Sequence, residues 1–389
     1  MPLKYKVHQL GGKKLKKGRL LIVLGVLGLL GVFGFLVNNV RQEKEFKNQE
    51  RITKKSQTNH HQQHHSVKKQ ETAVATIDRN QQLDQLLQKV GFNGTALIVK
   101  NQQIVLRKGY GTANQAQQTA NTSQTLFPIA STEKALIATS ILQLDQQHRL
   151  SVNDPINKYL PGFPNGSQIK LRNFLTHTSG IVGRAEDNQN KSLDQMIAEI
   201  EHNGIHRPLG SWQYEDSNYT VLVKVLEKVT HESFKKYLMQ HIFKPAGIET
   251  VGYVNQNFSG LKNASIGYLK QNNQLTAVTI PNFSQLYGVS DMYMSVTSMY
   301  QFDWALKNKK LLDAAHLQLM FTPGSSSHYG MGFYNDPGLI VNRGYVAGWV
   351  ISNGLTHDGQ DYILLFSNVK DKQLSLGKLN SEILQILRK

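Results

Sequence analysis

The sequence predicts an α+β domain whose antiparallel sheet is built from both ends of the folded region and flanked by helices, with a helical lobe inserted between them. Two strand-like runs joined by a tight polar turn lie near the start, between residues 94 and 111. Apolar residues at helical spacing fill the middle, and strand-like runs return in GWVIS and YILLFSN near the end. Strands at the two ends of the domain would have to meet in one sheet.

Residues 1–19 form a basic segment that we expect on the cytoplasmic side of a membrane. They carry seven lysine and arginine residues and no acidic residue. The apolar run from Leu20 to Val37 would extend about 27 Å as a helix, just enough to cross a bilayer. The positive-inside rule then predicts a single-pass transmembrane signal-anchor over residues 20–40 and an extracytoplasmic domain after it. A cleaved signal peptide is the alternative, but NNVRQEKEF offers no small-residue cleavage pattern.

Residues 41–79 are predicted to be a disordered linker between the anchor and the domain. The stretch QTNHHQQHHSVKKQ is polar and lacks helical periodicity. A metal site on a helix is the alternative for its histidines, but nothing in the segment favours a helix, so we expect solvated side chains. These histidines are His60, His61, His64 and His65.

The remaining domain, residues 80–389, is mildly basic and has no cysteine. The whole chain has a net charge of +17, but most of it lies in the N-terminal segments, which leaves +6 from residue 80 onward. That charge requires no nucleic-acid partner. Without cysteine the domain has neither disulfides nor thiol chemistry and must be stabilised by its core. We expect no metal and no organic cofactor.

The predicted elements of the domain follow in order along the chain. The first is a helix over residues 83–92, followed by two strands that turn at Asn101 and Gln102. The helices of the middle part are predicted over residues 131–148, 191–203, 217–230, 232–241 and 296–307. The chain ends with strands over 348–352 and 362–368 and an amphipathic helix over 379–389.

Ser131 and Lys134, in ASTEKALIAT, lie one helical turn apart at the start of an apolar helix. A serine hydroxyl becomes a good nucleophile when a base takes its proton, and a lysine desolvated in a cleft can act as that base. The alternative is a helix-capping serine with a solvated lysine, but only Ser131 follows a buried-looking strand and opens an apolar helix. The same spacing also begins at Ser66, Ser167, Ser233, Ser259, Ser367 and Ser375.

Four stretches in order along the chain carry a resemblance to a known family. They are ASTEKALIAT, the segment ending in HTSGI, YEDSNY with Tyr214, and FTPGSSSHYGMGFYNDPGLIVNRGYVAGW. Their order resembles the serine β-lactamase and penicillin-binding protein superfamily. Within it, the chain is most similar to membrane-anchored penicillin-binding proteins of type X and to teichoic-acid D-alanine esterases of Gram-positive bacteria. The resemblance covers about residues 75–389 and implies a β-lactamase/transpeptidase-like fold.

The resemblance also implies an acyl-enzyme mechanism and roles for the matching residues. Ser131 would be the nucleophile, Lys134 its base and Tyr214 the relay of a proton to the leaving group. The backbone N–H of Ser131 would form half of an oxyanion hole, and a second amide would come from the late strand near Trp349 or Val350.

His177, in the segment that ends in HTSGI, is expected to serve the fold and not the chemistry. The family uses that segment structurally. The chain also has no G-x-S-x-G elbow, which a serine, histidine and aspartate triad on an α/β-hydrolase fold would require.

Two residues depart from the family pattern. Asp216 stands where the second box usually ends in Asn, and Asn342, followed by Arg343 and Gly344, stands where the third box usually begins with Lys or His. The usual cation helps to hold the free carboxylate of a D-alanyl-D-alanine peptide or a penicillin. A neutral amide at this position makes such a substrate less well suited to the site. Neighbouring residues of a strand face opposite ways, so Arg343 replaces the cation only if a bulge turns it inward.

These departures favour a D-alanyl ester of teichoic acid as the substrate. Its alanine amine is free and cationic, it has no terminal carboxylate, and it hangs from a polymer of phosphates. Asp216 would bind the ammonium, and Arg343 with the domain's positive charge suits the phosphates.

We therefore predict a membrane-anchored, extracytoplasmic serine hydrolase that acts on D-alanyl groups of the cell envelope, with the teichoic-acid ester favoured. A D-alanyl-D-alanine carboxypeptidase or penicillin-binding protein, acting on peptidoglycan stem peptides, is one alternative. A catalytically silent cell-wall binding protein is the other. The altered boxes favour this last alternative, whereas the intact Ser131, Lys134 and Tyr214 oppose it. The sequence predicts no oligomeric state.

Overall fold

The computed structural model describes residues 75–255, 257–272 and 274–389. The predicted signal-anchor and the histidine-rich part of the predicted linker lie outside these residues. The end of the predicted linker is corrected, because Ile77–Asp78 forms strand β1 and pairs with β3 at the edge of the main sheet. None of the helices within the described residues has the length and apolar character needed to span a bilayer.

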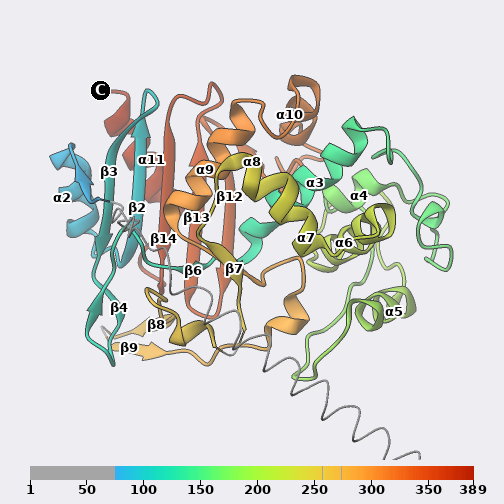
Figure 1. Ribbon diagram of the computed structural model, residues 1–389, viewed down its shortest axis with the longest axis horizontal. Coiled ribbons are helices and arrows are strands. Elements are labelled where there is room, and N and C mark those ends of the chain that lie inside the picture. Colours follow the sequence, from blue (N-terminus) through green and yellow to red (C-terminus); the bar gives the residue numbers. More distant parts are fainter. Residues whose placement is uncertain (1–74, 256, 273) are drawn as a thin grey trace, which may run out of the picture. The chain divides into compact units, whose positions relative to one another are not determined.

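A seven-stranded antiparallel sheet joins the two ends of the domain, as predicted, in the order β1-β3-β2-β14-β13-β12-β11 (Figure 1). The link is the pairing of β14 with β2. Asn101 and Gln102 both have positive φ, which a two-residue hairpin turn between twisted strands requires. The other strands of the sheet are β2 (Gly94–Lys100), β3 (Gln103–Tyr110), β11 (Tyr334–Asp336), β12 (Leu339–Val346), β13 (Trp349–Leu355) and β14 (Tyr362–Ser367).

The two faces of this sheet belong to two separate hydrophobic clusters. Along β2, Leu97 and Val99 face the cluster that the sheet shares with the helical lobe, whereas Ala96 and Ile98 face the other. Successive side chains of a strand point to opposite faces, and both faces are covered, so the strand is apolar throughout. The second cluster is closed by α2 (Gln81–Lys89) and α11 (Leu376–Leu387).

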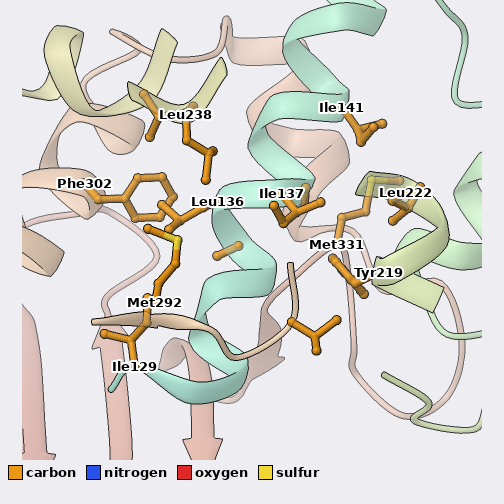
Figure 2. Packing of buried hydrophobic residues seen from close by; sticks show 14 of the residues in the cluster. Ile129, Leu136, Ile137, Ile141, Tyr219, Leu222, Leu238, Met292, Phe302 and Met331 are labelled. Carbon is orange, nitrogen blue, oxygen red and sulfur yellow. The ribbon is translucent and has the colours of Figure 1, made fainter. Parts of the chain in front are cut away.

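Helix α3 (Lys134–Gln146) runs through the centre of the larger cluster and carries the start of the candidate site (Figure 2). Its side chains from Lys134 to Leu144 are all buried, so the helix has no solvated face. Thr139 and Ser140 satisfy their hydroxyls by donating to carbonyl groups four residues earlier, at 2.7 and 2.9 Å. Figure 2 shows Leu136 and Ile137 of this helix between Phe302 and Tyr219, which come from two other helices.

The helical lobe lies beside the sheet in Figure 1. Predicted helices over 217–230 and 296–307 coincide with α6 and α9, and the one over 232–241 continues as a π-helical turn, η3. The helices are α4 (Leu171–Leu175), α5 (Leu193–Asn203), α6 (Ser217–Thr230), α7 (Phe234–Leu238), η3 (Met239–Phe243), α8 (Lys244–Ala246), α9 (Val296–Lys307) and α10 (Ala314–Phe321). Short 3₁₀ turns are η1 (Ala130–Glu133), η2 (Ile156–Lys158), η4 (Phe258–Gly260) and η5 (Phe283–Leu286).

Three smaller sheets complete the fold, and one of them positions the site. In that sheet β10 (Met292–Met294) lies between β6 (Phe127–Pro128) and β7 (Val251–Tyr253), and β6 leads directly into η1. The second sheet contains β15 (Val369–Asp371), β8 (Tyr268–Gln271) and β9 (Gln274–Ala277), and the third contains β4 (Thr112–Asn114) and β5 (Thr119–Ala120).

Candidate active site

Ser131 lies in the turn η1, between the end of β6 and the start of α3. The chain enters this turn through Ala130, whose φ of 51° is in the left-handed region that only a few non-glycine residues adopt. Gly344 of β12 packs directly on the turn, since a Cβ atom there would lie 2.7 Å from the Ile129 carbonyl oxygen and 3.0 Å from the Ser131 amide nitrogen. A glycine is therefore needed at this contact.

Lys134 is buried, and its amine has three oxygen neighbours. Nζ donates to Ser131 Oγ at 3.1 Å and to the Val289 carbonyl at 3.2 Å. It also lies 2.7 Å from Oδ1 of Asp216. The structure thus brings together the predicted nucleophile, the predicted base and the unusual aspartate.

Two other Ser-x-x-Lys pairs show how the same spacing forms a helix cap. Ser233 Oγ accepts a hydrogen bond from the backbone N–H of Lys236, and Ser375 Oγ accepts one from the backbone N–H of Lys378. In both pairs the serine meets the lysine backbone, as in an N-cap. Ser131 Oγ instead lies 3.1 Å from the amine of the lysine side chain, close enough for a proton to pass between them.

Tyr214 and Tyr219 surround the Lys134 amine, which lies 5.3 Å and 5.8 Å from the two ring centroids. Tyr214 lines the same cavity as Ser131 and Asp216. Burial, reinforced by the charge of Asp216, raises the pKa of the Tyr214 phenol well above its usual range. Tyr214 therefore keeps its proton at neutral pH and can donate it toward a leaving group.

His177 is buried beneath Tyr214, with the two ring centroids 4.3 Å apart. Its Nδ1 accepts a hydrogen bond from the backbone N–H of Glu215 at 3.3 Å, and its carbonyl accepts one from Gln213 at 2.9 Å. Burial, together with the charge of Lys134, lowers the pKa of His177 to about 3, so the imidazole is neutral. These contacts support the loop that carries Tyr214.

Asp216 lies between the buried amine and solvent. Oδ1, which faces Lys134, is itself buried, although 41% of the side chain is exposed. Burial opposes ionisation, but the charge and hydrogen bond of Lys134 outweigh it and hold the pKa of Asp216 below its usual range. Asp216 is a carboxylate at neutral pH.

The third box lies on β12, where the residues alternate between two environments. Asn342 is buried, and its Nδ2 donates to the Thr132 carbonyl at 3.3 Å, so this side chain supports the turn of the nucleophile. Its prediction as a substrate-binding residue is therefore corrected. Arg343 faces the opposite way, because β12 pairs with β13 without a bulge. It pairs with Asp336 and lies 5.1 Å from the ring centroid of Tyr334.

A cavity of about 550 Å³ opens on Ser131, and residues of β12, β13, β15 and the start of α11 form part of its wall. It is lined by predicted site residues Ser131, Tyr214, Asp216, Arg343 and Gly344. Tyr334 and Lys370 also line it, and neither was predicted as a site residue. Tyr334 lies within the fourth family stretch but eight residues before Asn342, and Lys370 lies beyond that stretch. Lys370 Nζ lies 4.6 Å from the ring centroid of Tyr345, another residue of the wall.

Trp349, predicted to bind substrate, does not reach this cavity. Its side chain is in the core, where the indole N–H donates to Ser265 Oγ at 2.9 Å. The prediction fails because Trp349 faces the interior side of β13, whereas Val350, the next residue, lines the cavity. Gly344 makes the close approach to the Ser131 amide, so we expect the second oxyanion donor from the following amide, that of Tyr345.

The site can carry out acyl transfer with its own side chains. It has a hydroxyl next to a buried amine, a protonated phenol, and a backbone N–H at the start of a helix. Within the described ranges, no three histidine, aspartate or glutamate side chains come together as a set of metal ligands.

Comparison with known proteins gives consistent matches. The sequence profile of the family described as Beta-lactamase matches residues 79–375. PbpX of Bacillus subtilis, a protein named after the penicillin-binding proteins, is 44% identical over 322 residues, which are 83% of this chain and 82% of PbpX. A teichoic acid D-alanine hydrolase of Staphylococcus aureus is 29% identical over 310 residues, 78% of this chain and 77% of the relative. The crystal structure of FmtA from Staphylococcus aureus superposes with a TM-score of 0.73 at 26% identity, over 81% of this chain and 93% of FmtA.

Proposed function

The chain belongs to the beta-lactamase family of serine hydrolases, and from this premise we propose that it hydrolyses D-alanyl esters of teichoic acid. One observation carries the choice of substrate: the cavity that contains Ser131 also contains the half-exposed carboxylate of Asp216. A D-alanyl ester has a free ammonium two bonds from the carbonyl that Ser131 would attack. A carboxylate beside the nucleophile is suited to bind that ammonium.

In the proposed reaction Lys134 takes the proton of Ser131, and Ser131 Oγ attacks the ester carbonyl. The Ser131 N–H stabilises the oxyanion of the tetrahedral intermediate. When the intermediate collapses, Tyr214 gives its proton to the departing alcohol oxygen of the polymer and receives the proton that Lys134 took from Ser131, and D-alanyl-Ser131 remains. Water then attacks the acyl carbonyl and gives a proton to Lys134, and this proton passes to Ser131 Oγ as D-alanine leaves.

The substrate would also act on the ion pair between Lys134 and Asp216. In the free enzyme, the carboxylate of Asp216 neutralises the buried amine. An incoming alanyl ammonium would share the exposed side of the carboxylate and repel a second cation nearby. The substrate amine would therefore weaken the pairing of Asp216 with Lys134 and leave the lysine amine freer to contact Ser131.

The polymer chain of the substrate is suited to the cations of the cavity wall. Arg343 and Lys370 both line the cavity. Lys370 can contact a phosphodiester next to the alanylated unit, whereas Arg343, which already pairs with Asp336, adds positive charge nearby. The same cavity would thus hold groups for both charged parts of the substrate, Asp216 for the ammonium and these cations for the phosphates.

A D-alanyl-D-alanine carboxypeptidase is the second candidate function. The guanidinium of Arg343 favours it, because it is a cation in the wall of the cavity and could hold a terminal carboxylate. The pairing of Arg343 with Asp336 counts against this role. A silent binding protein is opposed by the contact between Lys134 and Ser131, which such a protein would not need.

We also propose that the domain faces the outside of the cell and stays bound to the membrane through residues 20–40. The support is the lysine-rich start and the apolar run from Leu20 to Val37. Protease added to intact protoplasts of a Gram-positive host should remove the domain. Full protection, or a shortened form in the medium, would contradict this topology.

The function is tested with the purified full-length protein and two substrates. D-alanylated lipoteichoic acid should release D-alanine, whereas a peptide ending in D-alanyl-D-alanine should release little. Ser131→Ala should release none from either. Release from the peptide alone would establish the carboxypeptidase instead, and no release from either substrate by a folded protein would favour the silent binding protein.

A further inference from the structure

Two buried carboxyl groups, those of Glu133 and Asp291, lie behind the catalytic pair and have no part in the reaction above. They are 0% and 3% exposed. Glu133 is the last residue of the turn that carries Ser131, and Asp291 directly precedes β10. Burial raises the pKa of both groups, and the charge of Asp291 raises that of Glu133 further. Two buried carboxyl groups within range of each other's charge do not both ionise readily, so we take the pair to hold one proton.

The surroundings indicate which group holds the proton. Lys235 Nζ lies 3.4 Å from Oδ2 of Asp291 and can balance its charge. Glu133 Oε1 is buried, and no donor from the described residues reaches it. Burial, reinforced by the charge of Asp291, raises the pKa of Glu133 well above its usual range. Burial also raises the pKa of Asp291, but the charge of Lys235 opposes this shift. We therefore assign the proton to Glu133 and the negative charge to Asp291.

Glu133 attaches the turn of the nucleophile to β10. Its Oε2 accepts a hydrogen bond from the backbone N–H of Met292 at 3.1 Å. The carbonyl of the same Met292 accepts one from the N–H of Ile129 at 2.9 Å, at the entry to the turn. One residue of β10 thus holds the turn both before and after Ser131.

Asp291 shapes the loop that orients the base. Its Oδ1 accepts a hydrogen bond from the backbone N–H of Gly288 at 3.1 Å and so closes residues 288–291 into a tight loop. Val289 lies inside this loop, and its carbonyl accepts the hydrogen bond from Lys134 Nζ. The carbonyl and Ser131 Oγ together fix where the amine lies.

We propose that Glu133 and Asp291, joined by one shared proton, are positioning residues that hold the Val289 carbonyl and the Ser131 turn in the register that the reaction needs. The shared proton joins two segments that are far apart in the sequence, and each segment carries one part of the catalytic geometry. The inference rests on the proposed function only in taking Ser131 and Lys134 as the catalytic pair.

The shared proton makes the contact between Glu133 and Asp291 sensitive to high pH. The charged and titratable groups around the pair are Lys134, Lys235, Tyr253, Tyr287 and, hydrogen-bonded to Tyr287, Glu227. Because the pKa of Glu133 is raised in the folded protein, the stability that the pair contributes is complete at acid pH and is lost as pH rises toward that pKa. Loss of the proton would place two negative charges in contact and separate the segments.

The test compares Glu133→Gln with Glu133→Ala in the full-length protein. Glutamine keeps an oxygen for the Met292 N–H and an N–H for Asp291, so it mimics the protonated acid, whereas alanine removes both contacts. A fluorophosphonate should acylate Glu133→Gln within about threefold of the wild-type rate at pH 7, and Glu133→Ala at least tenfold more slowly at equal folded fraction. As pH rises, the reaction rate with the probe and the melting temperature should fall for the wild type and stay nearly constant for Glu133→Gln. Asp303→Asn, another buried carboxyl but remote from the loop, is the control and should not alter the acylation rate.

Equal acylation rates for folded Glu133→Ala and wild type would overturn the proposal and leave the pair a purely structural role. Equal reductions of the acylation rate in Glu133→Gln and Glu133→Ala would also overturn it. Glutamine mimics the protonated acid, so the shared proton would then not be the cause of the effect. A crystal structure of Glu133→Ala separates this inference from the proposed function. Displacement of the Val289 carbonyl from Lys134 supports it even if the wild type is inert to every acylating probe, and an unchanged 3.2 Å contact refutes it.

Discussion

The amine of Lys134 lies 2.7 Å from a carboxylate oxygen of Asp216, yet the lysine side chain is 1% exposed and the aspartate side chain 41%. The base is enclosed by protein, whereas its counter-ion reaches into the cavity. A ligand can therefore act on the buried base through the carboxylate without touching the base.

Asp216→Asn should change which esters the enzyme prefers. Without the carboxylate, the alanyl ammonium loses its partner, so kcat/KM for D-alanyl esters with a free amine should fall more than tenfold, which is about 1.4 kcal/mol of transition-state stabilisation. Activity on the matched N-acetyl-D-alanyl ester should be held or raised, because that substrate brings no cation. The measurement is kcat/KM for both esters with both proteins.

The N-acetyl ester is the internal control for this prediction. A general disturbance of the site would lower both activities together. Equal losses on the two esters would show that Asp216 supports the site and does not recognise an ammonium.

Ser131→Ala should abolish labelling by a fluorophosphonate and leave the fold intact. The change removes the acceptor of one hydrogen bond from Lys134, which typically costs about 1 kcal/mol of stability. Ser375→Ala is the matched control, since Ser375 lines the same cavity and also begins a Ser-x-x-Lys sequence. Intact mass spectrometry should show one adduct on the wild type and on Ser375→Ala. An adduct on Ser131→Ala would place the nucleophile elsewhere.

Much of the fold could be predicted because local patterns agreed with tertiary packing. Helix α6 has the predicted bounds, and the hairpin of β2 and β3 turns at Asn101 and Gln102 although neither is glycine. Helix α10 (Ala314–Phe321) was not predicted. The strands of the smaller sheets, such as β6 with two residues, are too short to show a period.

The site was predictable where one motif contains both partners and not where a contact joins distant segments. Ser131 and Lys134 are one turn apart, so their contact follows from helix geometry. Trp349 was misplaced because the sequence does not tell which face of β13 points inward. Glu133 and Asp291 were missed because each is an ordinary acidic residue until the fold brings β10 against the turn.

Asp303 should make the domain less stable as pH rises from about 4 to about 8. Burial raises its pKa to about 8, against a partly compensating hydrogen bond from Asn353 Nδ2 at 3.0 Å. The unfolded chain releases this proton near pH 4, so between the two values folding takes up a proton and stability falls by up to about 1.4 kcal/mol per pH unit. Asp303→Asn removes the titration but keeps an oxygen for Asn353.

The free energy of unfolding, measured by urea denaturation of wild type and Asp303→Asn from pH 5 to pH 8, checks this sign. The free energy of unfolding of Asp303→Asn minus that of the wild type should be smallest at pH 5 and should increase with each pH unit. A constant difference, or one that shrinks toward pH 8, would show that the buried carboxyl is not protonated in the native protein.

Gly344→Ala should reduce catalysis through a direct steric conflict. The added Cβ would lie 2.7 Å from the Ile129 carbonyl oxygen, 2.8 Å from Ala130 Cβ and 3.0 Å from the Ser131 amide nitrogen, and none of these is the end of a flexible side chain. Either β12 or the turn must move, and the oxyanion donor moves with it. We expect kcat to fall at least a hundredfold, as for the loss of one oxyanion donor, with a smaller change in KM.

Gly354→Ala, on the neighbouring strand β13, is the matched control for this steric argument. Its added Cβ would have no neighbour nearer than 3.6 Å, which is ordinary contact. Both variants add one methyl group to a strand of the same sheet, so any general effect of alanine on the sheet is common to them. The ratio of their kcat values, at equal folded fraction by circular dichroism, therefore isolates the contact at Ser131. Similar kcat values of Gly344→Ala and Gly354→Ala on the same ester would contradict the prediction. They would show that the turn can move without loss of activity and that the oxyanion hole does not depend on the close approach of β12.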